Sequence, residues 1–137
     1  MISTRLHGCI DYGVAGLFAV AAGSPAISGP VRRLLATAGA YHTSYSAVTD
    51  YELGARPWLT MRQHLLFDAI GAAALLAAGA TLRRAPPAER ALLIGAGLAE
   101  FAVIACSART PGQAASIAYL PLDTPKPIAP DIYLVDS

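Results

Sequence analysis

The stretch RLHGCID at residues 5–11 decides the fold, because RQHLLFD at residues 62–68 repeats its pattern Arg-x-His-x-x-x-Asp. The two copies lie 57 residues apart, and each opens a long apolar run, residues 13–23 after the first copy and 69–80 after the second. Self-similarity of this kind indicates a duplicated supersecondary unit. The sequence therefore predicts two similar helical hairpins in tandem, each entered through a polar His/Asp turn.

Composition places the chain among membrane proteins of one domain. Of the 137 residues, 55% are hydrophobic and 14% are charged, against about 25% charged in soluble domains. The net charge is +1, and no basic patch with interleaved aromatic residues is present, which argues against a nucleic-acid partner. Two cysteines without CxxC spacing provide neither a disulfide framework nor a zinc motif.

Four apolar segments of helical length follow one another, separated by breaks rich in Gly and Pro. The predicted helices cover residues 6–23, 31–49, 61–81 and 88–107. They are about 24–30 Å long, close to the ~30 Å of a bilayer core. A soluble four-helix bundle would carry charged residues on each exposed face, and long parts of these segments carry none. We therefore expect an all-α fold, a four-transmembrane-helix bundle built from two tandem helical hairpins.

The repeat also sets the domain boundaries. Residues 1–109 are the predicted four-helix membrane domain, with repeat units at about 3–52 and 60–109. Residues 110–137 contain repeated prolines and are predicted to form an extended C-terminal tail.

Four spans place both termini and the central loop on one side of the membrane. The loops at 24–33 and 82–90 lie on the other side, and arginines near the spans number five there against four on the terminal side. The positive-inside rule then puts both termini outside, in a multi-pass protein of the cell membrane.

Every histidine and three carboxylates fall in the terminal half of this bundle. A His and an Asp four residues apart share one helix face, so each copy of the repeat projects both side chains together. Ionisable groups inside a membrane are costly unless they are paired, so a cluster of them is a functional-site hypothesis by default. The candidate metal ligands are His7, Asp11, His42, His64, Asp68 and Glu100.

Several roles fit this cluster at the level of sequence. Three histidines with carboxylates suit a transition metal such as Zn, Fe or Cu, and two histidines on facing helices suit a haem. The plainer alternative is helix packing, where such hydrogen bonds contribute about 0.6 kcal/mol each, or a small-ligand or proton-relay pocket.

The function that we expect from the residues is a small, non-enzymatic integral membrane protein whose cluster supports packing or binds a small ligand. One alternative is a metal- or haem-binding redox or transport component. Another is a non-catalytic subunit of a larger membrane complex, with the tail as its docking segment, or a homo-oligomer. No nucleophile elbow or phosphate-binding loop is present to support a hydrolase or a nucleotide-binding enzyme.

Three motifs resemble the SPW-repeat family of small bacterial membrane proteins: HGCIDY at 7–12, TDYELG at 49–54 and MRQHLLFD at 61–68. The resemblance covers about residues 3–80, and the naming tripeptide reads Ser-Pro-Ala at 24–26. It implies two tandem units, each a pair of membrane helices, and brings no assigned biochemical function.

Overall fold

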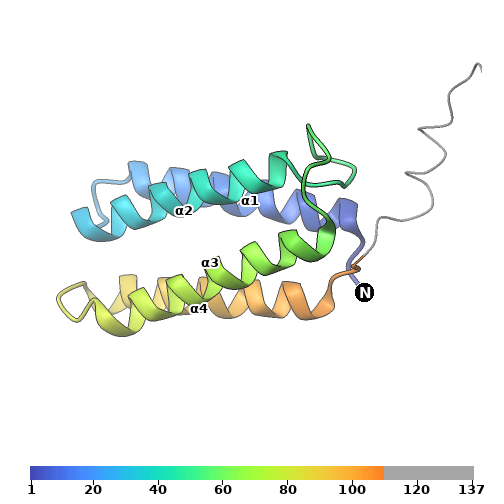
Figure 1. Cartoon of the computed structure of the whole chain (residues 1–137). Coiled ribbons are helices and arrows are strands. Elements are labelled where there is room, and N and C mark those ends of the chain that lie inside the picture. Colours follow the sequence, from blue (N-terminus) through green and yellow to red (C-terminus); the bar gives the residue numbers. More distant parts are fainter. Residues whose placement is uncertain (110–137) are drawn as a thin grey trace, which may run out of the picture.

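The computed structural model describes residues 1–109, so the predicted proline-rich tail lies outside the described residues. Four helices fill the described part of the chain, and no strand is present there (Figure 1). This confirms the predicted all-α fold and its four helices, with boundaries that differ by at most two residues. The helices are α1 (Thr4–Gly23), α2 (Gly29–Ala47), α3 (Met61–Thr81) and α4 (Pro87–Cys106).

The first helix of each hairpin begins with a side-chain N-cap. The hydroxyl of Ser3 accepts the backbone N–H of Leu6 at 3.2 Å, and the hydroxyl of Thr60 accepts that of Gln63 at 3.3 Å. Each of these side chains satisfies a backbone donor that the first helical turn leaves free. The duplicated sequence thus starts α1 and α3 at equivalent positions.

Glycines let the two helices of each hairpin approach closely. A Cβ added at Gly39 of α2 would lie 3.0 Å from the carbonyl oxygen of Ala15, and one added at Gly97 of α4 would lie 2.7 Å from that of Ala72. Small residues at a helix–helix contact permit such backbone approach. The pairs α1–α2 and α3–α4 therefore form the tightly packed hairpins of the fold (Figure 1).

Backbone hydrogen bonds join the two hairpins at one end. The N–H of Ile2 donates to Cys106 at 2.7 Å, and the N–H of Ala108 donates back to Ile2 at 2.8 Å. On the other side of the molecule, the N–H of Leu59 donates to Val48 at 2.8 Å. The starts of α1 and α3 and the ends of α2 and α4 consequently lie together, and we call this end the cluster end (Figure 1).

Two of the four helices, α1 and α3, are long and apolar enough to cross a membrane. Of the other two, α2 contains more polar side chains, including Arg32 and Arg33 near its start. The apolar helix α4 has three charged residues, Glu89 and Arg90 in its first turn and Glu100 near its end. The four predicted helices are thus confirmed, and by length and composition two of them, α1 and α3, could serve as membrane spans.

Candidate functional site

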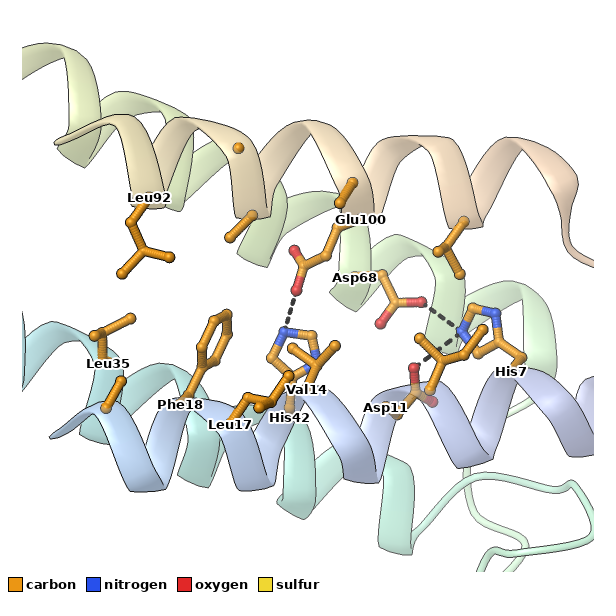
Figure 2. A pocket seen from close by; sticks show the side chains of 16 residues that line it. His7, Asp11, Val14, Leu17, Phe18, Leu35, His42, Asp68, Leu92 and Glu100 are labelled. Atoms are coloured by element: carbon orange, nitrogen blue, oxygen red, sulfur yellow. Dashed lines mark hydrogen bonds and ion pairs between the residues drawn. The ribbon is translucent and has the colours of Figure 1, made fainter. Parts of the chain in front are cut away.

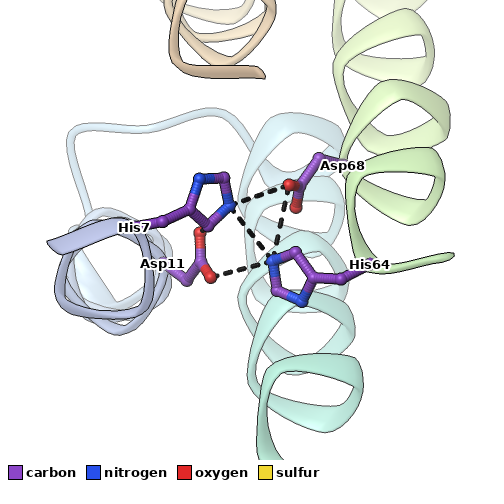
Figure 3. A group of neighbouring side chains, drawn as sticks. All are labelled: His7, Asp11, His64 and Asp68. Atoms are coloured by element: carbon purple, nitrogen blue, oxygen red, sulfur yellow. Dashed lines mark hydrogen bonds and ion pairs between the residues drawn. The ribbon is translucent and has the colours of Figure 1, made fainter. Parts of the chain in front are cut away.

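Four side chains from the two copies of the repeat meet at the cluster end (Figure 3). His7 and Asp11 project from α1, and His64 and Asp68 project from α3, each pair on one face of its helix as predicted. All four are buried, with at most 5% of their surface exposed. We call them the His/Asp cluster.

The two imidazole Nε2 atoms of the cluster lie at nearly equal distances from each other and from the neighbouring carboxylate oxygens. His7 Nε2 is 3.2 Å from His64 Nε2, 3.3 Å from Asp11 Oδ1 and 3.0 Å from Asp68 Oδ2. His64 Nε2 is 3.0 Å from Asp11 Oδ2 and 3.4 Å from Asp68 Oδ2. Both imidazoles therefore direct the same nitrogen into one small space between two carboxylates.

A serine fixes the protonation of His7. Ser107 Oγ donates its only proton to the carbonyl oxygen of Val103 at 2.6 Å, because a carbonyl can only accept. The same oxygen lies 2.7 Å from His7 Nδ1 and must accept from it. The proton of neutral His7 is thus on Nδ1, and Nε2 presents a lone pair to the cluster.

A threonine does the same for His64. Thr49 Oγ1 donates to the carbonyl oxygen of Tyr45 at 2.7 Å and accepts from His64 Nδ1 at 2.9 Å. Each hairpin thus orients the histidine of the other hairpin, since Thr49 follows α2 and Ser107 follows α4. In metal sites, a hydrogen-bond acceptor on the second ring nitrogen likewise holds a ligating histidine in one tautomer.

The result is a concentration of acceptors, whose carboxylates receive donors from outside the cluster: Tyr45 donates to Asp68, and Ser46 donates to Asp11 at 3.5 Å. The two Nε2 lone pairs lie 3.2 Å apart and 3.0–3.4 Å from carboxylate oxygens, and groups of like partial charge repel at such distances. Burial makes this arrangement more costly, because water cannot compensate for it. The cluster needs a shared cation, which is either added protons or a metal ion.

The distances from the imidazole nitrogens are close to those of a tetrahedral metal site, with Asp11 approaching His7 through Oδ1 and His64 through Oδ2. Zinc bonds to His nitrogen and carboxylate oxygen of about 2.0–2.2 Å place neighbouring ligands about 3.3–3.6 Å apart in a tetrahedron. The observed separations of 3.0–3.4 Å are slightly shorter. A haem does not fit between His7 and His64, because 3.2 Å between their Nε2 atoms is less than two metal–nitrogen bonds of about 2.0 Å each.

Two of the six predicted ligands lie outside this cluster. His42 Nε2 contacts Glu100 Oε1 in a separate buried ion pair further along α2 and α4 (Figure 2). Tyr45 connects this pair to the cluster, since its hydroxyl donates to Asp68 Oδ1 and lies 2.7 Å from His42 Nδ1. The hydroxyl therefore accepts from His42, and the second carboxylate oxygen of Asp68 faces the cluster.

Tyr51 covers the cluster from the α2–α3 loop. Its ring lies 5.5 Å from that of His64 and against Gly8, where an added Cβ would approach the ring to 2.2 Å. Burial of the phenol raises the pKa of Tyr51 above its usual value. The side chain thus stays neutral at physiological pH and closes the cluster.

Sequence reasoning missed the two hydroxyls that orient the cluster histidines. Thr49 and Ser107 occupy equivalent positions in the two units, but α3 has 21 residues where α1 has 20. This extra residue shifts the repeat by one position after α3, so a comparison at the fixed offset of 57 residues does not align them.

Comparison with known proteins adds no family to this description: no family model, no curated protein and no solved structure matches the chain. The resemblance to the SPW-repeat family stays a prediction.

Proposed function

We propose that the chain is an integral membrane protein with four spans that binds a divalent transition-metal ion through its His/Asp cluster. The observation that carries the proposal is the meeting of four buried ligand residues, two from each hairpin, in which both neutral imidazoles direct an Nε2 lone pair toward the carboxylates. Imidazole and carboxylate together suit Zn, Fe or Mn, and a tetrahedral arrangement favours zinc.

Exposed side chains support a lipid environment. Val20 is 75% exposed, Leu17 69%, Leu66 60% and Leu98 58%. These residues come from α1, α3 and α4, so apolar surface faces outward on both hairpins. Large exposed apolar surface marks a membrane or protein contact.

The path of the chain supports four spans over two. Both α1 and α3 begin at the cluster end and are long enough, at 20 and 21 residues, to cross a bilayer core of ~30 Å. A membrane crossed by both must also be crossed by α2, which returns the chain to the cluster end. The return of α4 to Ile2 gives the fourth span. In this proposal both termini lie outside and the arginine-bearing loops lie inside.

The form of the site favours a structural or storage role for the metal over hydrolytic catalysis. Catalytic zinc usually has three protein ligands and an open position for water, whereas structural zinc has four. Here four protein atoms converge and each residue is buried. The ion would replace electrostatic repulsion between the hairpins with four shared bonds.

Metal binding is tested by elemental analysis of the full chain purified in detergent, with Asp50→Asn as the matched control for Asp68→Asn. Asp50 is an exposed carboxylate in the α2–α3 loop. We expect about one metal ion per chain in the wild type and in Asp50→Asn, and a loss of at least tenfold in Asp68→Asn. Circular dichroism verifies that all three proteins keep their helices.

A metal-free wild type after growth and purification with added zinc would contradict the proposal. Protons would then neutralise the cluster. This is the state that the alternative function requires, in which the cluster serves only helix packing. That alternative has one specific observation in its favour: each imidazole already lies within 3.0 Å of a carboxylate of the opposite hairpin.

The four spans are tested separately with a membrane-impermeant thiol reagent. Cys9 and Cys106 are exposed free thiols, so both are first replaced by serine. Arg56→Cys in the α2–α3 loop and Arg84→Cys in the α3–α4 loop should then react from opposite sides of the membrane. Labelling of both from the same side would contradict four spans.

A further inference from the structure

The two hairpins are related by an approximate two-fold symmetry. Leu35 and Leu93 are both fully buried at equivalent positions, as are the hydroxyls of Thr49 and Ser107 that accept from the histidines. A symmetric frame of this kind has two equivalent side openings between the hairpins, one between α2 and α3 and the other between α4 and α1.

Aromatic side chains fill the first opening. Tyr45 of α2 and Phe67 of α3 stack with ring centroids 5.7 Å apart and an interplanar angle of 18°. Tyr41 packs on Tyr45 at 4.9 Å, and its hydroxyl donates to the carbonyl oxygen of Phe67 at 2.9 Å. The contact between α2 and α3 is closed by these three rings.

Small side chains occupy the equivalent positions of the second opening. Ala99 and Val103 of α4 stand where α2 has Tyr41 and Tyr45, and Ile10 of α1 stands where α3 has Phe67. All three line a cavity of about 600 Å³ between α1 and α4 (Figure 2). The cavity therefore results from sequence differences within a duplicated frame, and it lies within the usual range of ligand pockets, about 300–1,000 Å³.

One buried polar atom of a residue that lines this cavity has no hydrogen-bond partner within residues 1–109. Glu100 is 9% exposed and its side chain points into the cavity beside His42 (Figure 2). His42 contacts Oε1, whereas Oε2 has no hydrogen-bond partner among the described residues. Most of the remaining lining is apolar, from residues such as Leu17, Phe18 and Leu92.

Protonation of the pair leaves Oε2 as an acceptor. His42 Nδ1 donates to Tyr45, so the contact between His42 Nε2 and Glu100 Oε1 must contain one proton, on either partner. The pair is neutral as a unit in both cases, and Oε2 can accept a hydrogen bond in both. A neutral donor is therefore better matched to this atom than a cation.

We propose that the cavity binds an apolar molecule with a hydroxyl head group, whose ring or chain contacts α1 and α4. Its hydroxyl donates to Glu100 Oε2 after a small movement of this buried carboxylate toward the cavity. Such a molecule would enter sideways from the lipid between α1 and α4. This inference rests on the proposed membrane location and is independent of the metal ion. An unpartnered buried acceptor is costly, so a hydroxyl donor gains affinity by satisfying it.

The experiment measures binding of radiolabelled 4-octylphenol to the full chain in phosphatidylcholine nanodiscs. The matched competitor is 4-octylanisole, which has the same body and cannot donate a hydrogen bond. We expect saturable binding to the protein, with 4-octylphenol displacing the label at a concentration at least tenfold lower than 4-octylanisole does. In Glu100→Met this preference should disappear. Equal displacement by both compounds from the wild type would contradict the proposal.

Two glycine variants locate the site. An added Cβ meets nothing within 4 Å at Gly95 or at Gly16, but only Gly95 lines the cavity. Gly95→Leu should reduce binding at least tenfold, and Gly16→Leu should leave it unchanged. Unchanged binding to Gly95→Leu would contradict the proposal. A second contradicting result would be a wild type that is dimeric and does not bind the phenol, together with a Gly95→Leu variant that is monomeric. In that case a second copy of the chain would fill the cavity. Membrane insertion and metal content are measured on the same samples. A failure of the proposed membrane location or metal binding is thereby distinguished from a failure to bind the phenol.

Discussion

At the scale of single residues, the hydroxyls of Thr49 and Ser107 determine what the His/Asp cluster can bind. Each uses its only proton on a carbonyl four residues earlier and accepts from a histidine of the opposite hairpin. This leaves two Nε2 lone pairs facing the carboxylates, which is the protonation state that a metal ion requires.

Replacing Thr49 with valine keeps the shape of the side chain and removes the acceptor for His64 Nδ1. We expect metal affinity to fall 10- to 100-fold, the usual effect of losing a partner that orients a ligating histidine. Competition with a chromogenic zinc chelator in detergent measures the change. Thr43→Val is the control, because Thr43 also donates to a carbonyl four residues earlier, that of Gly39, and does not contact the cluster. Equal losses in both variants would show that Thr49 acts only through the helix.

At the scale of elements, the packing of α3 on α4 depends on where a glycine stands. Gly97 and Gly95 are two residues apart on the same helix, but only an added Cβ at Gly97 meets the backbone, 2.7 Å from the carbonyl oxygen of Ala72. Gly97→Ala should destabilise the protein by about 1–3 kcal/mol, because rigid backbone has to move. Gly95→Ala should be neutral or stabilise it by up to about 1 kcal/mol through helix propensity. Reversible unfolding in a denaturing detergent measures both, and an equal effect would contradict the packing argument.

A second element-scale contact ties the hairpins together at the end opposite the cluster. The buried carboxylate of Glu89 on α4 accepts from the backbone N–H of Ser28 at 2.9 Å and from its hydroxyl at 2.5 Å. A negative charge there also interacts favourably with the N-terminus of α2.

We expect Glu89→Gln to lower the free energy of unfolding by about 1.5–3 kcal/mol, the range for hydrogen bonds to a charged group. The same unfolding measurement applies, with Arg32→Gln as control, because Arg32 is an exposed charge in the first turn of α2 and should change stability by less than about 0.5 kcal/mol. A smaller loss in Glu89→Gln than in the control would mean that the contact does not join the hairpins.

Local patterns predicted the helices and the cluster well, and contacts between the hairpins poorly. The apolar runs and the His-x-x-x-Asp spacing lie within single helices, so the helices predicted at 6–23 and 61–81 and their shared polar faces followed from sequence. His42 stands two helical turns before Thr49, about 10 Å along α2, and this distance separates it from the cluster. Sequence periodicity within a helix carries no information on how one hairpin packs against the other. The hydroxyl partners, the Glu100 pair and the cavity all depend on that packing, so they could not be predicted.

At the scale of the whole molecule, the proposed metal joins two hairpins that pack on each other less closely than the two helices within each hairpin do. Close helix packing occurs within each hairpin, and a cavity separates α1 from α4. A metal that binds only the folded protein stabilises it by mass action, about 4.1 kcal/mol at a free metal concentration of 1,000 times its dissociation constant. We therefore expect the unfolding midpoint of the metal-depleted wild type to rise continuously as buffered free zinc is increased.

Because Asp11 and Asp68 come from different hairpins, the double variant Asp11→Asn, Asp68→Asn should lose this dependence on zinc. It should also be more stable than the metal-depleted wild type, since neutral amides remove two buried negative charges that would face each other without a cation. Thermal unfolding followed by circular dichroism at several zinc concentrations tests both statements. A wild type whose midpoint does not respond to zinc, and which is more stable than the double variant, would show that protons already neutralise the cluster and that the imidazole–carboxylate pairs alone hold the hairpins together.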